Sequence, residues 1–334
     1  MPARPYFYTI AIPKDNDKGP LVMEQILSSI HEMKETVSLE IWGTNRCRVK
    51  IQFAVQAKEF LKTLSESHFP GIDIREKTDI ATRLKGKNLS VTHLVLKTAP
   101  IFPIRRYSQT GDWIKKEWVN PYQAILSPLR KMRTGEMKGI QIILKPLSGV
   151  WRKRGMDTLK ISDIISAWWI FKRWWRLKDW FINIVYYCWP LRMVFLIMTW
   201  KWRTRHLPDR IDHRGHTQES VSESARSKLS QAGFAVTIRL IYAGSLKDAD
   251  STLHEMSGGF GQFNIDELNG FKIKGIVSSK KIFRSVIRRK PASPAILSVE
   301  ELAGILTLPD ISVKIPELQK RSEEHTSELQ SRQS

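Results

Sequence analysis

The fold is decided by PYFYTIAIPKDNDKGPLVMEQILSSIHEMKETVSLEIWGTNRCRVKIQFAV, residues 5–55. Apolar and polar residues alternate over Tyr6–Ile12, which predicts a strand. After a loop rich in Pro, Asp and Gly, Leu21–Lys34 places apolar residues on one helical face: Met23, Ile26, Leu27, Ile30 and Met33. A strand followed by an amphipathic helix is therefore expected near the start of the chain.

The next segments complete a known order of elements. Val37–Trp42 and Arg48–Ala54 alternate on either side of a turn, which is typical of a hairpin. Helical spacing returns over Phe60–Leu64, and Ile72–Ile74 predicts a short closing strand. The order β-α-β-β-α-β is that of the split βαβ, or ferredoxin-like, arrangement, so we expect a first α+β domain over residues 5–80.

The second half repeats this style more loosely. Strands are predicted at Val91–Lys97, Gly139–Pro146, Phe234–Tyr242 and Phe271–Ile273. Helices are predicted from Asn120-Pro121, where Pro128 should kink or split the helix, and over Ser222–Gln231 and Ala249–Phe260. We expect an α+β fold of two sheets with helices on one face, the second domain comprising residues 88–150 and 217–290.

A Trp-rich segment, residues 151–216, interrupts the second domain. Residues 151–205 hold twelve Lys and Arg against three Asp, and nine of the chain's twelve tryptophans. Basic residues interleaved with Trp suit the interface of an anionic membrane. We therefore expect membrane association by Trp168, Trp169, Trp174, Trp175, Trp180, Phe181, Trp189, Phe195, Trp200 and Trp202, with basic flanks Lys172, Arg173, Arg176, Lys178, Lys201, Arg203 and Arg205.

The apolar centre of this segment is Trp180–Trp200, whose one charged residue is Arg192. A helix of this length reaches roughly 31 Å, enough to cross a bilayer. Pro190 and Arg192 near its middle, together with basic flanks at both ends, favour a re-entrant or in-plane hairpin whose ends share one face. A single span and a hairpin buried against a protein partner remain alternatives.

The chain shows no set of residues with the spacing of a catalytic, cofactor or metal site. No G-x-x-x-x-G-K-[ST] phosphate loop occurs, and Gly258, Gly259 and Gly261 are typical of a helix end. His213 and His216 with Asp212 lack a second pair of ligands for zinc. The chain is therefore not expected to be an enzyme by itself.

Two charged groups have simpler explanations than chemistry. Asp248 and Asp250 precede a predicted helix, where the helix dipole favours negative charge. The cluster of Arg284, Arg288, Arg289 and Lys290 could meet nucleic-acid phosphates, but a solvated face is the ordinary explanation.

The setting is expected to be reducing. Cys47 and Cys188 are far apart in sequence and do not suggest a disulfide framework, and Met1–Lys14 does not resemble a secretory signal. With the membrane-associating segment, this predicts a location at the cytoplasmic face of the inner membrane.

The last native segment is expected to be residues 291–320. In ILSVEELAGILTLP, Ile296–Pro309, Ser298 and Glu301 have the spacing of a capping box, and Pro309 closes the helix. Residues 321–334 include RSEEHTSELQS, which reads like a translated sequencing adapter. We expect this tail to be artefactual or disordered, and the reading frame to have run past its true end.

Four segments resemble one family. PKDNDKGPLVMEQILSSIHE from Pro13, FPIRRY from Phe102, IQIILKP from Ile140 and ILSVEELAGILTLP from Ile296 are similar to the N-terminal region of bacterial conjugation-type, HerA-like ATPases. These ATPases are relatives of type IV secretion motors. The resemblance implies that the helix capped by Ser298 leads into a P-loop motor domain, whose phosphate-loop positions have no counterpart here.

The resulting expectation is a non-catalytic, membrane-associating region that docks and assembles a motor. The partners it implies are membrane lipid, the missing ATPase domain in cis, further copies of the chain and secretion-system subunits. The rival is a stand-alone membrane-anchored protein that binds nucleic acid, which the formal net charge of +21 favours.

Overall fold

The computed structural model describes residues 5–44, 48–56, 66–69, 71–109, 119–157, 159, 221–266, 268–316 and 318. The chain forms two units, one of residues 1–148 and 231–334 and the other of residues 149–230. The predicted helix at Phe60–Leu64, the cysteines, the His213 group, all membrane-associating residues and their basic flanks lie outside the described residues.

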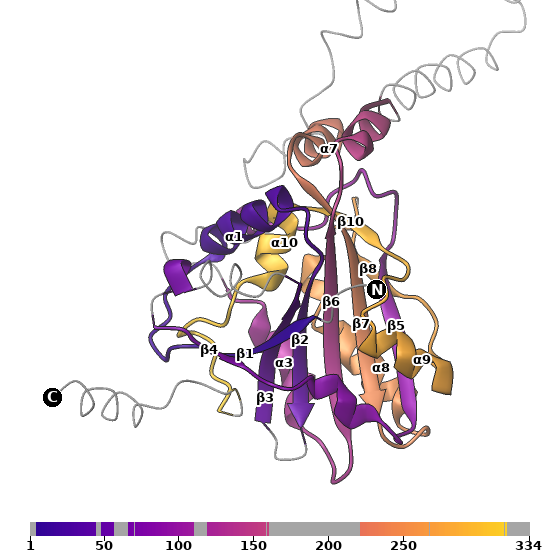
Figure 1. Cartoon of the computed structure of the whole chain (residues 1–334). Coiled ribbons are helices and arrows are strands. Elements are labelled where there is room, and N and C mark those ends of the chain that lie inside the picture. The colour runs from indigo at the N-terminus through magenta and orange to yellow at the C-terminus, as the bar shows by residue number, and fades with distance from the viewer. Residues whose placement is uncertain are drawn as a thin grey trace, which may run out of the picture. The chain divides into compact units, whose positions relative to one another are not determined.

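The larger unit is an α+β structure built on one large antiparallel sheet (Figure 1). The strands follow the order β4-β1-β3-β2-β6-β7-β5-β8, with β9 beside β5 and β10 beside β7. Their bounds are β1 Tyr6–Ala11, β2 Val37–Thr44, β3 Arg48–Val55, β4 Asp73–Glu76, β5 Leu89–Leu96, β6 Met137–Pro146, β7 Gly233–Ala243, β8 Phe271–Ile273, β9 Val277–Ser278 and β10 Ala295–Ser298.

The two predicted sheets are one, because β2 and β6 pair from Val37↔Leu144 to Gly43↔Lys138. All of β2 and most of β6 are buried, and a strand covered on both faces is most stable in the middle of a sheet. The strand order is mirrored about this pair: β4-β1-β3-β2 on one side corresponds to β8-β5-β7-β6 on the other.

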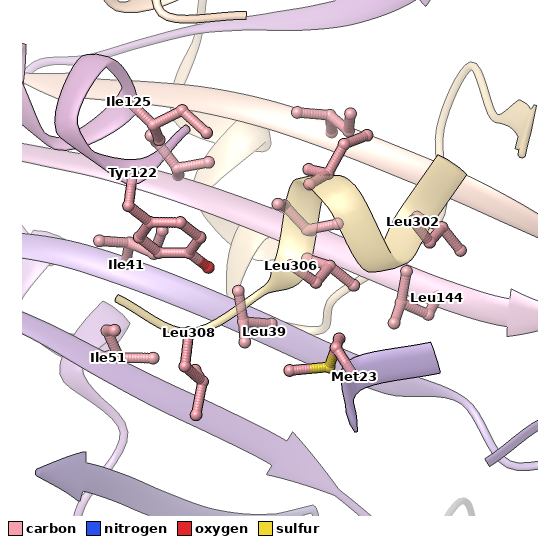
Figure 2. Packing of buried hydrophobic residues seen from close by; sticks show 14 of the residues in the cluster. Met23, Leu39, Ile41, Ile51, Tyr122, Ile125, Leu144, Leu302, Leu306 and Leu308 are labelled. Carbon is pink, nitrogen blue, oxygen red and sulfur yellow. The ribbon is translucent and has the colours of Figure 1, made fainter. Parts of the chain in front are cut away.

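One face of the sheet carries the larger helices, α1 Pro20–Glu32, α3 Tyr122–Arg130, α8 Ala249–Gly258 and α10 Val299–Leu306. Their apolar residues and the inward residues of the strands form one buried cluster. Leu302 and Leu306 of α10 lie over Leu39 and Leu144 of the central strands (Figure 2). Since burial of each such side chain contributes about 1.5–3 kcal/mol, this cluster dominates the stability of the unit.

The prediction that helices lie on one face alone is wrong. The 3-10 helix η1, Ile80–Leu84, and α9, Lys280–Ile287, pack on the other face, where a second cluster includes Trp42, Leu84 and Val286. The physical reason is the apolar side of α9, whose Ile282, Phe283 and Ile287 are partly buried against that cluster. In sequence, Lys280, Lys281 and Arg284, which lie before and among these residues, obscure this pattern.

Pro128 lies within α3, Tyr122–Arg130, without splitting it into two helices. Its missing N–H leaves the carbonyl of Ala124 without the usual helical donor. Gly259, the C-cap of α8, lies against this position: a Cβ there would be 2.8 Å from the Ala124 oxygen. The close approach of the two helices therefore requires glycine at residue 259.

The smaller unit is described only at its two ends. Residues 150–157 are helical, and α7, Val221–Ser230, ends the unit. A Cβ on Gly155 would be 2.4 Å from the Leu229 side chain, so these two helical segments are in contact. Within the described parts of the chain, no helix is long and apolar enough to span a membrane.

Candidate functional site

The insertion between β6 and β7 leaves and re-enters the sheet at one point, which we call the insertion root. β6 and β7 pair from Met137↔Ala243 to Pro146↔Phe234. Beyond the last pair, the Leu147 N–H donates to the Gly233 carbonyl at 2.9 Å. The two ends of the inserted segment are therefore fixed side by side by an antiparallel ladder, whatever the residues between them do.

Strand β7 connects the insertion root to the last described helix. On one edge, the first residues of β7 pair with β6. On the other edge they pair with β10, from Gly233↔Ser298 to Val236↔Ala295. This edge is free for β10 because β5 pairs only with the later part of β7, Ile238–Ala243. The segment that enters α10 is thus hydrogen-bonded to the strand that leaves the insertion.

The start of α10 is held by a capping box. The Ser298 hydroxyl accepts from the Glu301 N–H at 3.4 Å, and the Glu301 carboxylate accepts from the Ser298 N–H at 2.7 Å. Both residues are fully buried. The other carboxylate oxygen of Glu301 accepts from the Ile104 N–H at 2.7 Å, so one side chain joins α10 to the loop that precedes Tyr107.

Glu300, the residue before Glu301, binds three side chains, one of them from the FPIRRY segment. Arg106 lies 3.5 Å from its carboxylate, and the Ser108 hydroxyl donates to it at 2.5 Å. Gln231, two residues before β7, donates from its side-chain amide to the same carboxylate at 2.7 Å. The carboxylate of Glu300 therefore connects the insertion root, α10 and the FPIRRY segment.

Tyr107 extends this group of contacts to α1. Its hydroxyl donates to the Glu24 carboxylate at 2.6 Å. Burial and this hydrogen bond raise the pKa of the Tyr107 phenol well above its usual value. The hydroxyl therefore stays protonated at neutral pH and acts as a donor.

The end of α10 is fixed as well. Asn120 donates to the Leu308 carbonyl at 3.1 Å, and Asn16 donates to the Pro309 carbonyl at 2.8 Å. The N–H of Ile311 donates to the Asn16 carbonyl at 2.9 Å. Both ends of α10 are thus bonded to loops from the first half of the chain. We call the contacts around Ser298–Pro309 the α10 junction.

A second polar group lies on the opposite face of the sheet, where one residue from each of five neighbouring strands is in direct register. This polar row consists of Gln52, Glu40, Gln141, Arg239 and His93. Gln141 donates to Glu40 at 2.8 Å and accepts from Arg239, which also donates to His93 at 3.2 Å. Burial, Arg239 and Lys274 lower the pKa of His93 to about 4, so this imidazole is neutral at pH 7.

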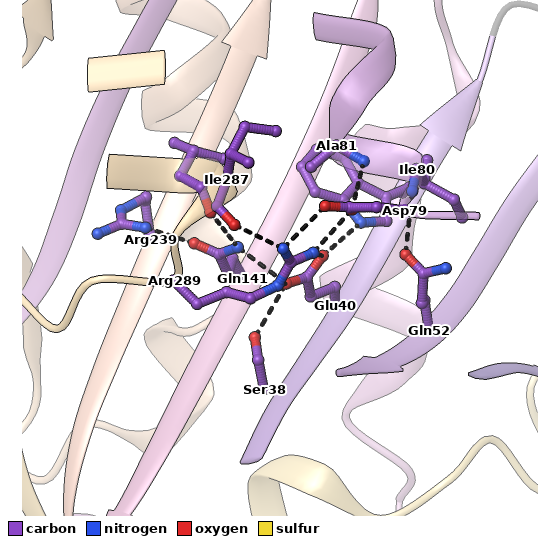
Figure 3. Close-up of polar contacts among 12 residues, drawn as sticks. Ser38, Glu40, Gln52, Asp79, Ile80, Ala81, Gln141, Arg239, Ile287 and Arg289 are labelled. Atoms are coloured by element: carbon purple, nitrogen blue, oxygen red, sulfur yellow. Dashed lines mark hydrogen bonds and ion pairs between the residues drawn. The ribbon is translucent and has the colours of Figure 1, made fainter. Parts of the chain in front are cut away.

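Arg289 covers the polar row (Figure 3). Its guanidinium binds the Glu40 carboxylate at 2.8 and 3.1 Å and the Asp79 carboxylate at 2.7 and 2.8 Å. Such two-pronged pairs are strong because the fork of the guanidinium matches the carboxylate. The backbone of Arg289 has a φ of 49°, a conformation that is costly without glycine and is held here by these bonds. Arg289 therefore anchors the end of α9 to the sheet.

The predicted residues fall into three groups. Ser298 and Glu301 form the capping box that their spacing predicts. Asp248 is the N-cap residue of α8, but its side chain makes no capping bond and instead pairs with Arg133 at 2.7 Å. Arg289 is buried and so does not belong to an exposed basic cluster, while Arg284, Arg288 and Lys290 are exposed.

The sequence argument missed the polar row. The sequence does carry a signal for it: Glu40, Gln52, Gln141 and Arg239 each have an apolar residue directly before and directly after them in their strands. A polar residue at such a position needs a buried partner. The partners come from segments far away in sequence, so the pattern alone does not identify them. In the described residues no group of His, Cys, Asp and Glu could hold a metal ion.

The model of one protein family matches the chain over residues 6–321; its description is "Domain of unknown function (DUF8128)". The matched range includes all of the smaller unit, most of the larger one, and every contact of the α10 junction and the polar row. No curated protein matches the chain.

Proposed function

Because the chain belongs to the DUF8128 family, whose description gives no activity, we propose from its geometry that it is a docking platform for a motor. It is the non-catalytic, membrane-associating N-terminal region of a conjugation- or type IV secretion-type ATPase. In this proposal the Trp-rich insertion meets lipid, α10 leads towards the motor domain, and copies of the platform assemble at the cytoplasmic face of the inner membrane.

The observation that carries the proposal is the position of β7. Its first residues bond to β6, which leads into the insertion, and to β10, which leads into α10. The Gln231–Glu300 bond adds a side-chain link between the same two places. A force or a change of position at the insertion root would therefore reach α10 through hydrogen bonds, without a flexible linker.

The mirrored strand order supports the fold that we propose for the platform. Each half, β1–β4 and β5–β8, has the strand order of a split βαβ unit, and the two units join edge to edge through β2 and β6. The insertion replaces the hairpin turn of the second unit, which corresponds to the turn between β2 and β3 in the first.

The insertion root also bears on the membrane geometry. A single crossing would place the two ends of the inserted segment on opposite sides of the bilayer, whereas β6 and β7 are paired up to Pro146↔Phe234. The contact of Gly155 with Leu229 keeps the ends together further along the chain. This favours a re-entrant or in-plane hairpin in the Trp-rich insertion, residues 151–216, over a single span.

The test is flotation with vesicles that contain anionic lipid. The intact chain should float, and a variant without Trp168–Trp202 should remain with the soluble fraction. A variant without residues 322–334, which lie outside the family match, is the control and should float like the intact chain. If the chain without Trp168–Trp202 still floats, the insertion is not what binds lipid and the proposal fails.

The motor part of the proposal has its own test. The chain as given should not turn over ATP, and a longer protein that continues beyond residue 320 should do so in a membrane-stimulated manner. ATP turnover by the present chain would contradict the assignment.

The alternative function is a membrane-anchored protein that binds nucleic acid through the insertion. Its support is the charge of residues 151–205, twelve cations against three anions, with nine tryptophans that could stack on bases. It predicts tight, salt-dependent binding of single strands without lipid, lost when Trp168–Trp202 are removed.

A further inference from the structure

The face of the sheet that carries η1 and α9 presents exposed cations from two segments that contain no acidic residue. Residues 268–299 contain eight Lys and Arg and no Asp or Glu, and residues 80–111 contain six and none. These two segments provide α9 and η1, which are neighbours on the sheet through a shared apolar cluster. Segments far apart in sequence thus bring positive charge to one side of the molecule.

Of these cations, nine whose side chains the structure describes are exposed, and five of the nine lie in η1 or α9 or within three residues of them: Arg83, Lys85, Arg284, Arg288 and Lys290. We call these five the basic surface. Among the described residues, none of their side chains forms a hydrogen bond or an ion pair. By contrast, Arg75, Arg106 and Arg133 each pair with a carboxylate. The charge of the basic surface is therefore available to a partner.

The polar row holds α9 in place beneath these side chains. Gln141 donates to the Val286 carbonyl at 3.2 Å, and Arg239 donates to the Lys290 carbonyl at 2.8 Å. Arg289 adds its bonds to Glu40 and Asp79. One arginine of the basic run is thus an anchor, and it holds the backbone that carries Arg284 and Arg288 on the sheet.

We propose that the basic surface binds the phosphates of duplex nucleic acid, a function beyond membrane docking. Arg284 and Arg288 are four residues apart, about 6 Å along the helix, and each guanidinium can bind a phosphate with two N–H groups. Phe283, the aromatic residue of α9, packs on the sheet instead of facing outwards. Among the described residues of α9 and η1 no aromatic ring is exposed for stacking on single-stranded bases, so recognition by these elements rests on the backbone phosphates.

An anionic membrane is the other polyanion that such a surface could meet. Binding of a helix to a membrane interface depends on apolar side chains that enter the lipid as well as on charge. The apolar side of α9 is already used against the sheet. Phosphate contacts alone suffice for non-specific binding of a duplex, so the duplex is the better match.

The test compares binding of a labelled duplex DNA by the full-length chain and by Arg284→Gln/Arg288→Gln, over a series of salt concentrations. Each phosphate contact contributes about 0.9 to the slope of log K against log salt, so the double variant should lose about 1.8 from that slope. The matched control is Lys131→Gln/Lys247→Gln, two exposed lysines near α3 and α8, which removes the same charge and should leave the slope unchanged.

The charge-reversed variant Arg284→Glu/Arg288→Glu should bind the duplex at least tenfold more weakly than the control pair at the same salt. Equal salt slopes for the Arg284/Arg288 variant and the Lys131/Lys247 variant would overturn the proposal. A loss of affinity that is confined to single-stranded DNA would overturn it as well. Flotation with anionic vesicles separates the two polyanions. If the arginine pair is needed for vesicle binding and not for duplex binding, the surface faces a membrane and the proposal is wrong.

Discussion

Gly258 and Gly259 are consecutive residues at the end of α8, but only Gly259 lies against another helix. A Cβ at Gly259 would be 2.8 Å from the Ala124 oxygen and 2.9 Å from the Ile125 Cα, whereas at Gly258 it would meet nothing within 4 Å. Both residues lack a positive φ. The difference between them is therefore steric and not conformational.

Gly259→Ala should lower the free energy of unfolding by about 1–3 kcal/mol, because α3 and α8 must move apart. Gly258→Ala should be neutral or should stabilise the chain by about 0.5–1 kcal/mol, since alanine is the better helix former. Denaturant unfolding of the two variants measures this difference. A similar effect of both substitutions would show that the helices are not as close as the structure has them.

His93 should make the stability of the protein depend on pH. Its pKa in the folded chain is about 4, below the usual value of 6.5, because of burial and the neighbouring Arg239 and Lys274. The unfolded chain therefore binds more protons between these values, so stability should fall as the pH drops from about 6.5 to about 4. His93→Gln should flatten this part of the curve of melting temperature against pH.

The matched control for this variant is His254→Gln, because His254 is exposed on α8. It should leave the pH dependence of the melting temperature unchanged. If His93→Gln unfolds with the same pH dependence as the intact protein, the low pKa of His93 is contradicted.

At the scale of elements, α10 depends on Glu301. Ser298→Ala should cost about 1 kcal/mol, the usual cost of losing an N-cap. Glu301→Ala should cost at least twice as much, because the buried N–H groups of Ser298 and Ile104 both lose their acceptor. Glu301→Gln keeps the shape with one acceptor and should lie between them. Denaturant midpoints test this order, and a larger loss for Ser298→Ala would contradict it.

The sequence predicts the elements that have a clear period. The spans predicted for β1, α1, the β2–β3 hairpin, β6, β7 and α8 lie within a few residues of their bounds in the structure. It fails for β10 and α9. β10 has four residues, and its pairing exists only because β5 leaves the first part of β7 uncovered. α9 was interpreted by its charge, while its apolar residues pack on a face that was expected to be bare.

Only part of the candidate site can be predicted, because only part of it is formed by residues close together in sequence. The capping box is local, so the spacing of Ser298 and Glu301 identifies it. Its attachment to Ile104, Arg106 and Gln231 is not local, and no period or composition indicates it. The segments that carry the family resemblance nevertheless prove to be neighbours: those from Pro13, Phe102 and Ile296 all contribute to the α10 junction.

At the scale of the whole molecule, the larger unit should fold without the smaller one. Joining residue 148 to residue 231 by a short Asn-Gly turn would close the β6–β7 ladder as a hairpin, because Leu147 and Gly233 are already hydrogen-bonded. We expect a cooperative unfolding transition within a few degrees of the intact chain. Loss of cooperative unfolding would show that residues 149–230 are needed for the sheet.

Deletion of residues 280–290, which joins residue 279 to residue 291, is expected to have a much larger effect than deletion of the smaller unit. It removes α9 and Arg289, so Glu40 and Asp79 lose their buried cation. Because an unpaired buried charge costs about 3–5 kcal/mol, this variant should be strongly destabilised. If both deletions unfold at the same temperature, the anchoring role of Arg289 is wrong.

The polar row also determines how the two halves of the sheet can be aligned. Side chains alternate between the faces of a strand, so sliding β2 by one residue along β6 would turn Glu40 towards the aliphatic layer under α10. There it would have neither Gln141 nor Arg289 as a partner. Every pairing that is misaligned by an odd number of residues thus buries an unpaired charge, so half of the alternative registers between the mirrored halves are excluded by one carboxylate.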